Sequence, residues 1–138
     1  MANKNIIIPA TYQDIRIADQ ALHEMLDSLG VSDDHIIPCE LAFHELLINL
    51  IDHAYEGDPT RIIEIELIAD SSCINIQTID SGKPNNLDLS AISMPDPLDL
   101  IEGGYGLAII LSQMDHVSYQ TENNKNVWKL EKRFTGSS

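Results

Sequence analysis

Two neighbouring segments, 61–68 and 73–79, alternate apolar and polar side chains along their length. This alternation is typical of strands that bury one face, and the four residues between the segments suit a hairpin turn. The buried face of such a pair needs other elements to cover it. The chain before the pair has the periodicity of helices, so the sequence predicts helices packed on one side of an antiparallel sheet.

The remaining elements are predicted from periodicity and from turn residues. We expect an edge strand at 5–9, helices at 11–30 and 32–55, and, after the hairpin, a short helix at 107–114 and strands at 117–121 and 127–134. Thr11, with Asp14 three residues later, predicts the N-cap of the first helix. Pro38 is tolerable only near the first turn of the second helix. This order predicts an α+β two-layer sandwich, with about five mainly antiparallel strands and three helices on one face.

The length and charge of the chain limit what it can do. Its 138 residues suit one domain, spanning 1–138, with a single two-layer core. A formal charge of -14 would repel a phosphate backbone, so we expect no direct binding to nucleic acid. No apolar run approaches the ~18 residues of a membrane span, and the start lacks the apolar region of a signal peptide. We therefore expect a soluble, cytoplasmic protein.

The two cysteines point to no metal or redox site. Cys39 and Cys73 lie in apolar segments and lack a CxxC spacing, so we expect two reduced core thiols.

A polar stripe runs along the second predicted helix. At about 100° per residue, Glu45, Asn49, Asp52, His53 and Glu56 share one sector, opposite an apolar face. The stripe could be only the solvated side of an amphipathic helix. Asparagine within a helix is unfavourable, however, and its amide oxygen is a suitable ligand for Mg²⁺. A carboxylate one turn earlier could accept a proton during phosphoryl transfer.

Two glycine-containing segments follow. Asp80 ends an apolar strand two residues before Gly82, and could close an Asx-turn or accept a hydrogen bond from the amine of adenine. Gly104 and Gly106 precede a helix, where they could form a lid hinge or free N–H groups for phosphate. The stretch between these two segments, about 83–104, has no periodicity. A loop of this length is typical of a lid, a binding loop or disorder.

In this order the three segments resemble the N, G1 and G2 boxes of the GHKL (Bergerat-fold) ATPase and kinase superfamily. Within it, the chain is similar to the anti-sigma factor serine/threonine kinases of the RsbW and SpoIIAB type. The likeness includes the runs 49–55, 111–117 and 126–134 and covers about residues 6 to 134.

The resemblance implies ATP and Mg²⁺ as cofactors and a role for each matching residue. Glu45 would be the catalytic base, Asn49 the metal ligand and Asp80 the adenine acceptor, with a lid at about 83–104. The other nucleotide-binding candidates are His53, Gly82, Lys83, Gly104, Tyr105, Gly106, Leu107 and Asn126. His53 could instead be structural or a second base, and Lys83 could be an ordinary surface lysine.

Two positions depart from the family pattern. Tyr105 stands where many of these kinases have an arginine between the last two glycines, which weakens the case for phosphoryl transfer. Lys125 and Asn126 replace a late Gly-Thr pair, so an amide or a lysine would supply the phosphate contact expected there.

The resemblance implies a kinase that holds a regulatory target, such as a sigma factor, and phosphorylates a STAS-domain antagonist. It also implies a homodimer formed through the first strand and helix. One alternative is a nucleotide-dependent module that sequesters its partner with weak or no kinase activity, which Tyr105 favours. A free-standing ATPase related to histidine kinases is a further alternative, although no dimerisation helix with a phosphoacceptor histidine precedes the catalytic part.

Overall fold

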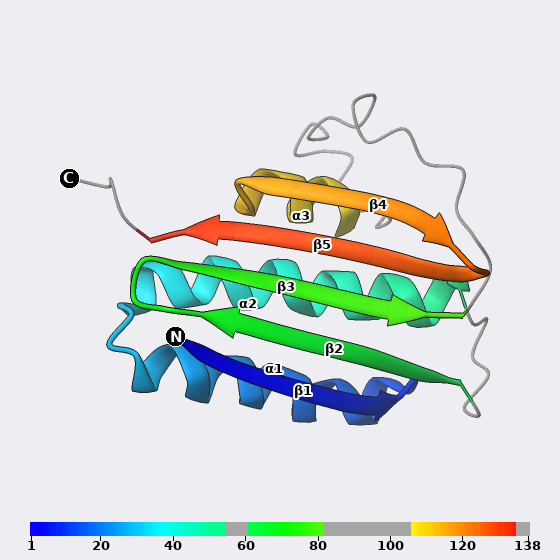
Figure 1. Ribbon diagram of the computed structural model, residues 1–138, viewed down its shortest axis with the longest axis horizontal. Coiled ribbons are helices and arrows are strands. Elements are labelled where there is room, and N and C mark those ends of the chain that lie inside the picture. The colour runs from blue at the N-terminus through cyan, green and yellow to red at the C-terminus, as the bar shows by residue number, and fades with distance from the viewer. Residues whose placement is uncertain (55–60, 82–105, 135–138) are drawn as a thin grey trace, which may run out of the picture.

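The computed structural model of the chain describes residues 1–54, 61–81 and 106–134. They form a five-stranded sheet in the order β1-β2-β3-β5-β4 with three α-helices (Figure 1). The strands are β1 (Ala2–Pro9), β2 (Ile62–Ala69), β3 (Cys73–Asp80), β4 (His116–Glu122) and β5 (Lys125–Arg133). The helices are α1 (Tyr12–Ser28), α2 (Asp33–Asn49) and α3 (Gly106–Gln113), and a π-helical turn, η1 (Leu50–Ala54), continues α2.

The fold class expected from the sequence is confirmed. All four pairs of neighbouring strands are antiparallel. The helices lie behind the sheet in the view of Figure 1, where the viewer faces the uncovered side. Alternate residues of the central strands point into the helix layer, and the core includes the fully buried Phe43, Leu67 and Trp128.

The ends of the first two helices follow local rules. Thr11 caps α1: its hydroxyl accepts a hydrogen bond from the Asp14 N–H at 3.2 Å, as predicted. Pro38 lies in the second turn of α2, one turn later than expected. A proline there cannot donate to the carbonyl four residues earlier, yet the helix continues because its buried face packs on the core.

The second predicted helix is not α-helical to its end. The α-helix stops at Asn49, and Leu50–Ala54 follow as a π-helical turn. The 100° phasing therefore no longer applies after Asn49. Asp52, expected in the polar stripe, accepts a hydrogen bond from the Tyr12 hydroxyl of α1 instead. Glu56 lies outside the described residues.

The last two strands are longer than predicted because their turn is tighter. Asn123 and Asn124 have φ angles of 53° and 62°, and form a two-residue hairpin connection. This left-handed pair matches the twist of the strands it joins, and asparagine tolerates the conformation better than most residues. Lys125 and Asn126, expected in the loop, consequently belong to β5, and Asn126 pairs with Asp80 of β3.

Candidate functional site

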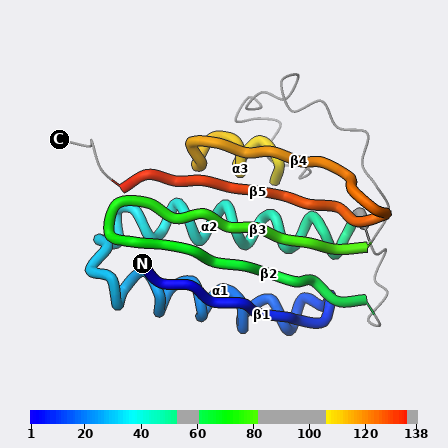
Figure 2. Tube along the Cα trace, in the orientation of Figure 1, coloured from blue at the N-terminus to red at the C-terminus, as the bar shows by residue number. Residues whose placement is uncertain are grey.

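Several predicted site residues gather at one end of the two layers. The C-terminal end of α2, the C-terminal end of β3 and the start of β5 all lie at the same end of the molecule (Figure 2). Glu45 and Asn49 come from the last turns of α2, Asp80 ends β3, and Asn126 is the second residue of β5.

Glu45 lies against the first residue of α3. A Cβ placed on Gly106 would lie 2.8 Å from Oε2 of Glu45, and the next nearest atoms of that side chain are 3.8 Å away. Gly106 does not have a positive φ, so the backbone conformation does not require glycine at this position. The absence of a side chain here serves instead to let the helix start approach the carboxylate.

Asp80 is a buried carboxylate, 3% exposed. Its Oδ1 accepts a hydrogen bond from Nδ2 of Asn126 at 2.8 Å, and Oδ1 of Asn126 accepts one from the Tyr119 hydroxyl at 2.7 Å. Asn126 is itself only 2% exposed. The carboxylate therefore belongs to a chain of hydrogen bonds that crosses three strands, β3, β5 and β4.

Other polar atoms are buried on the same face of the sheet. Thr78 precedes Asp80 by two residues, and its hydroxyl is buried with no hydrogen-bond partner in the described part of the chain. A polar, partly unsatisfied surface beside a buried carboxylate fits the amine-bearing edge of a purine better than an apolar ligand. The residues present therefore fit the adenine end of ATP.

Asn49 is half-buried and is the last α-helical residue of α2, immediately before the π-helical turn. Among residues 1–54, 61–81 and 106–134, no group of three His, Cys, Asp or Glu side chains could hold a metal ion. Leu107, the second residue of α3, is half-buried and packs against the core.

Five predicted positions have no described surroundings. Gly82, Lys83, Gly104 and Tyr105 lie outside the described residues, as does the predicted lid, and nothing is described of the His53 side chain. Their predicted roles remain expectations from the sequence.

Two histidines of the helix layer contact carboxylates between α1 and α2. His44 Nδ1 lies 2.7 Å from Oδ2 of Asp19, and His23 contacts Glu40. Burial raises the pKa of Asp19, although the hydrogen bond to His44 opposes this. His44 therefore contacts α1.

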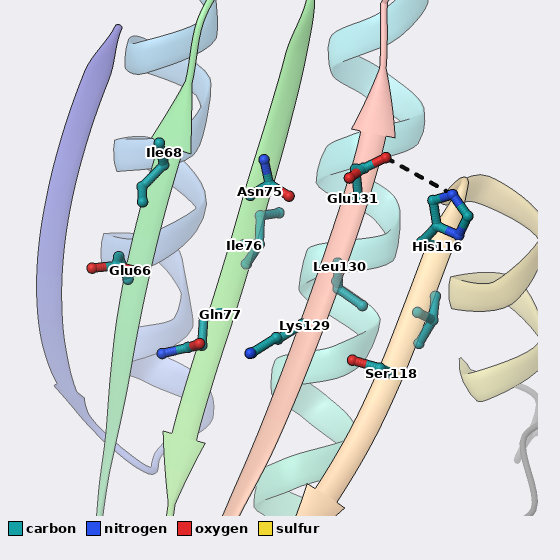
Figure 3. A pocket seen from close by; sticks show the side chains of 11 residues that line it. Glu66, Ile68, Asn75, Ile76, Gln77, His116, Ser118, Lys129, Leu130 and Glu131 are labelled. Atoms are coloured by element: carbon teal, nitrogen blue, oxygen red, sulfur yellow. Dashed lines mark ion pairs between the residues drawn. The ribbon is translucent and has the colours of Figure 1, made fainter.

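The uncovered face of the sheet carries a separate groove of about 460 Å³ (Figure 3). Residues of β2, β3, β4 and β5 line it, among them Glu66, Gln77, Lys129 and Glu131. Its lining includes none of the predicted site residues that the structure describes. A smaller depression of about 170 Å³ does reach Asp80, beside Ser81 and Lys125.

Sequence reasoning missed Tyr119. It lies in a strand predicted only from its alternation, and its role depends on the pairing that sets β4 beside β5. Its ring packs on Trp128 with the centroids 4.7 Å apart, which fixes the direction of its hydroxyl. A single sequence carries no signal for such a contact.

Comparisons with known proteins identify the family of the chain. A family model described as "Histidine kinase-like ATPase domain" matches residues 8–132. The serine-protein kinase RsbW of Halalkalibacterium halodurans is 28% identical over 122 residues, covering 84% of this chain and 74% of that protein. The serine-protein kinase RsbW of Staphylococcus aureus is also 28% identical, over 131 residues, covering 87% and 80%. The family resemblance expected from the sequence is thus confirmed.

Solved structures share the fold. The RsbU and RsbW domains of Rv1364c from Mycobacterium tuberculosis match with a TM-score of 0.67 at 18% identity, covering 96% of this chain and 32% of that one. This chain thus spans about a third of that protein. A chain of the SiaB-SiaC complex from Pseudomonas aeruginosa matches with a TM-score of 0.61 at 12% identity, covering 94% and 89%. None of the helices in the described ranges is long and apolar enough to cross a membrane.

Proposed function

The chain belongs to the histidine kinase-like ATPase domain family, and we propose that it is an ATP- and Mg²⁺-dependent serine/threonine protein kinase of the anti-sigma type. The observation that carries the proposal is the approach of Glu45 to the start of α3, at the end of the molecule where the buried Asp80 lies. A base, a helix N-terminus and a purine-reading carboxylate are the parts that such a kinase needs.

Asp80 is assigned to the recognition of adenine. A carboxylate accepts from the exocyclic amine of adenine, whereas guanine presents a carbonyl oxygen at the same place. Two acceptors facing each other in a buried site would leave both without a hydrogen bond, which is costly. Asp80 should therefore select ATP over GTP. Gly82, which follows, would allow the backbone close to the base.

Asn49 is assigned to Mg²⁺ and Glu45 to proton transfer. The metal supplies charge neutralisation for the phosphates when bound, and Asn49 would hold it through its amide oxygen. Glu45 would accept the proton of a serine or threonine hydroxyl as that oxygen bonds to the γ-phosphorus and the bond to ADP breaks. The N–H groups at the start of α3, at Gly106 and Leu107, would face the phosphates, with Gly104 and Tyr105 before them.

Three of the remaining roles rest on resemblance. Within a single domain of residues 1–138, the segment 83–104 would act as a lid, with Lys83 near the phosphates. His53 is proposed to support the nucleotide site one turn beyond Asn49. The protein is proposed to be cytoplasmic.

Protein partners are expected from the relatives. RsbW proteins are serine-protein kinases by name, and solved relatives were crystallised as RsbU and RsbW domains or as a SiaB-SiaC complex. We propose that this chain phosphorylates a STAS-domain antagonist and holds a second regulator, such as a sigma factor. A homodimer would use α1 and the edge strand β1, which pairs with β2 on one side only within the described sheet.

Tyr105 favours a second candidate function. Without the arginine that many related kinases carry there, the chain could bind ATP and sequester its partner without efficient phosphoryl transfer. This candidate shares the nucleotide site and differs only in the chemical step.

Labelled ATP separates the two candidates. The protein is incubated with γ-labelled ATP, Mg²⁺ and a candidate STAS protein, and compared with Glu45→Ala and Asn49→Ala. The kinase predicts label on a serine or threonine of the partner, lost by at least about a hundredfold in Glu45→Ala. Binding of ATP with no transfer to the physiological partner would instead identify the sequestering module.

A further inference from the structure

The hydrogen-bonded chain at Asp80 suggests a function for two residues that the family pattern does not explain. Asn126 occupies one of the two positions that depart from that pattern. Its partner on β4 is Thr121, and Tyr119 precedes Thr121 by two residues on the same strand. We propose that Tyr119 and Asn126 position the Asp80 carboxylate and thereby determine the selectivity for adenine over guanine, an inference that rests on the proposed adenine site.

The direction of the hydrogen bonds supports the proposal. The Tyr119 hydroxyl has one proton, which it donates to Oδ1 of Asn126 at 2.7 Å. With its oxygen so engaged, the amide of Asn126 presents its NH₂ group to Asp80, where it donates to Oδ1 at 2.8 Å. An amide turned this way requires an acceptor, so the arrangement favours Asp80 as a carboxylate and disfavours its use as a donor.

Burial makes this orientation consequential. Asp80 and Asn126 are 3% and 2% exposed, so water cannot easily replace a lost donor. The packing of the Tyr119 ring on Trp128 holds the hydroxyl in place. A carboxylate fixed at one oxygen cannot turn away from an approaching base. It therefore accepts a well-aligned hydrogen bond from the amine of adenine, and it cannot rotate to relieve the repulsion from the carbonyl of guanine.

Lys125 and Asn126 replace a Gly-Thr pair, and the sequence left either the lysine or the amide as the source of a phosphate contact. The amide of Asn126 bonds within the sheet to Asp80 and Tyr119. We therefore assign Asn126 to the base end of the nucleotide.

Three variants test the assignment by the ratio of the dissociation constants for ATP and GTP, measured by calorimetry on the full chain. Tyr119→Phe removes one hydroxyl and keeps the ring on Trp128. Asn126→Thr and Asn126→Val have the same shape, but only threonine can donate to Asp80. Ser118→Ala, which removes a hydroxyl from the opposite face of β4, is the control.

The proposal predicts that the preference for ATP falls about three- to tenfold in Tyr119→Phe and further in Asn126→Val. Asn126→Thr should retain more of it than Asn126→Val, and Ser118→Ala should match the wild type. A merely structural role would weaken the binding of both nucleotides alike and leave the ratio of their dissociation constants unchanged. Should Asn126→Val fail to fold, as thermal unfolding would reveal, Tyr119→Phe decides.

Two failures can be told apart. If the wild type binds no ATP, the proposed function is wrong, and this inference with it. If the wild type prefers ATP and Tyr119→Phe keeps the full preference, the adenine site stands and the positioning role of Tyr119 and Asn126 is overturned.

Discussion

Gly106 lies so close to Glu45 that a methyl group in its place would sit 2.8 Å from the Oε2 atom. Real Cβ atoms essentially never lie this close to another atom, so one of the two must move. The atom that would meet the new Cβ is the end of a flexible side chain, whereas the Gly106 backbone belongs to α3. The carboxylate would therefore yield, and the start of the helix controls where Glu45 lies.

Gly106→Ala should accordingly separate stability from activity. We expect a free energy of unfolding within about 1 kcal/mol of the wild type, because Glu45 can rotate and alanine favours the helix. Phosphoryl transfer should fall at least about tenfold, because the base is displaced. The measurements are urea unfolding and transfer of labelled phosphate to a STAS partner.

A double-mutant cycle identifies the cause. In a Glu45→Ala background the Gly106→Ala change should have little further effect on transfer, since the group it displaces is gone. Equal losses in both backgrounds would show that Gly106 acts independently of Glu45.

The contact between His23 and Glu40 should make stability depend on pH. The hydrogen bond that His23 donates to the Glu40 carboxylate raises the pKa of His23 above its usual 6.5. The folded state therefore binds this proton more tightly than the unfolded chain does. The contribution is fully present below about pH 6.5 and is lost as the pH rises through the folded pKa.

Urea unfolding of the wild type and His23→Gln, followed between about pH 6 and pH 8, measures this. The stability advantage of the wild type should shrink as the pH rises, and Glu40→Gln should remove the same dependence. An advantage that grows with pH would contradict the sign.

The two cysteines should differ sharply in reactivity. Burial raises the pKa of Cys39 to about 12, so its thiolate is nearly absent near neutral pH, while Cys73 is half-buried at the start of β3. A thiol reagent at about pH 8 should modify Cys73 first and Cys39 only on unfolding. Mass spectrometry of Cys73→Ser, which should stay unmodified while folded, checks the assignment.

Much of the architecture could be predicted from the sequence, since strand alternation and the Thr11 cap act locally. The α-helical phasing was sufficient to relate Glu45 to Asn49, because both precede the π-helical turn. It does not extend to Asp52, because the π-helical turn changes the rotation per residue and leaves no periodic signal in the sequence. The bond between Asn126 and Asp80 could not be foreseen, since it depends on the register between β3 and β5, two strands that lie far apart in the sequence.

The turn between β4 and β5 offers a further test. Asn124 has a φ of 62°, where glycine is unstrained and alanine is not. Asn124→Ala should destabilise the protein by about 1 kcal/mol relative to Asn124→Gly. Urea unfolding of the pair measures the difference, and equal stabilities would mean that the left-handed turn does not form.

The central claim is that the end of β3 binds ATP through Asp80. Calorimetry with ATP and Mg²⁺ on the wild type and Asp80→Asn tests it most directly. Asparagine keeps the shape of the side chain but replaces a negatively charged hydrogen-bond acceptor with a neutral amide. We predict one ATP per chain for the wild type, weaker binding without Mg²⁺, and affinity reduced at least about tenfold in Asp80→Asn. No binding by the wild type, or equal binding by both proteins, would contradict the claim.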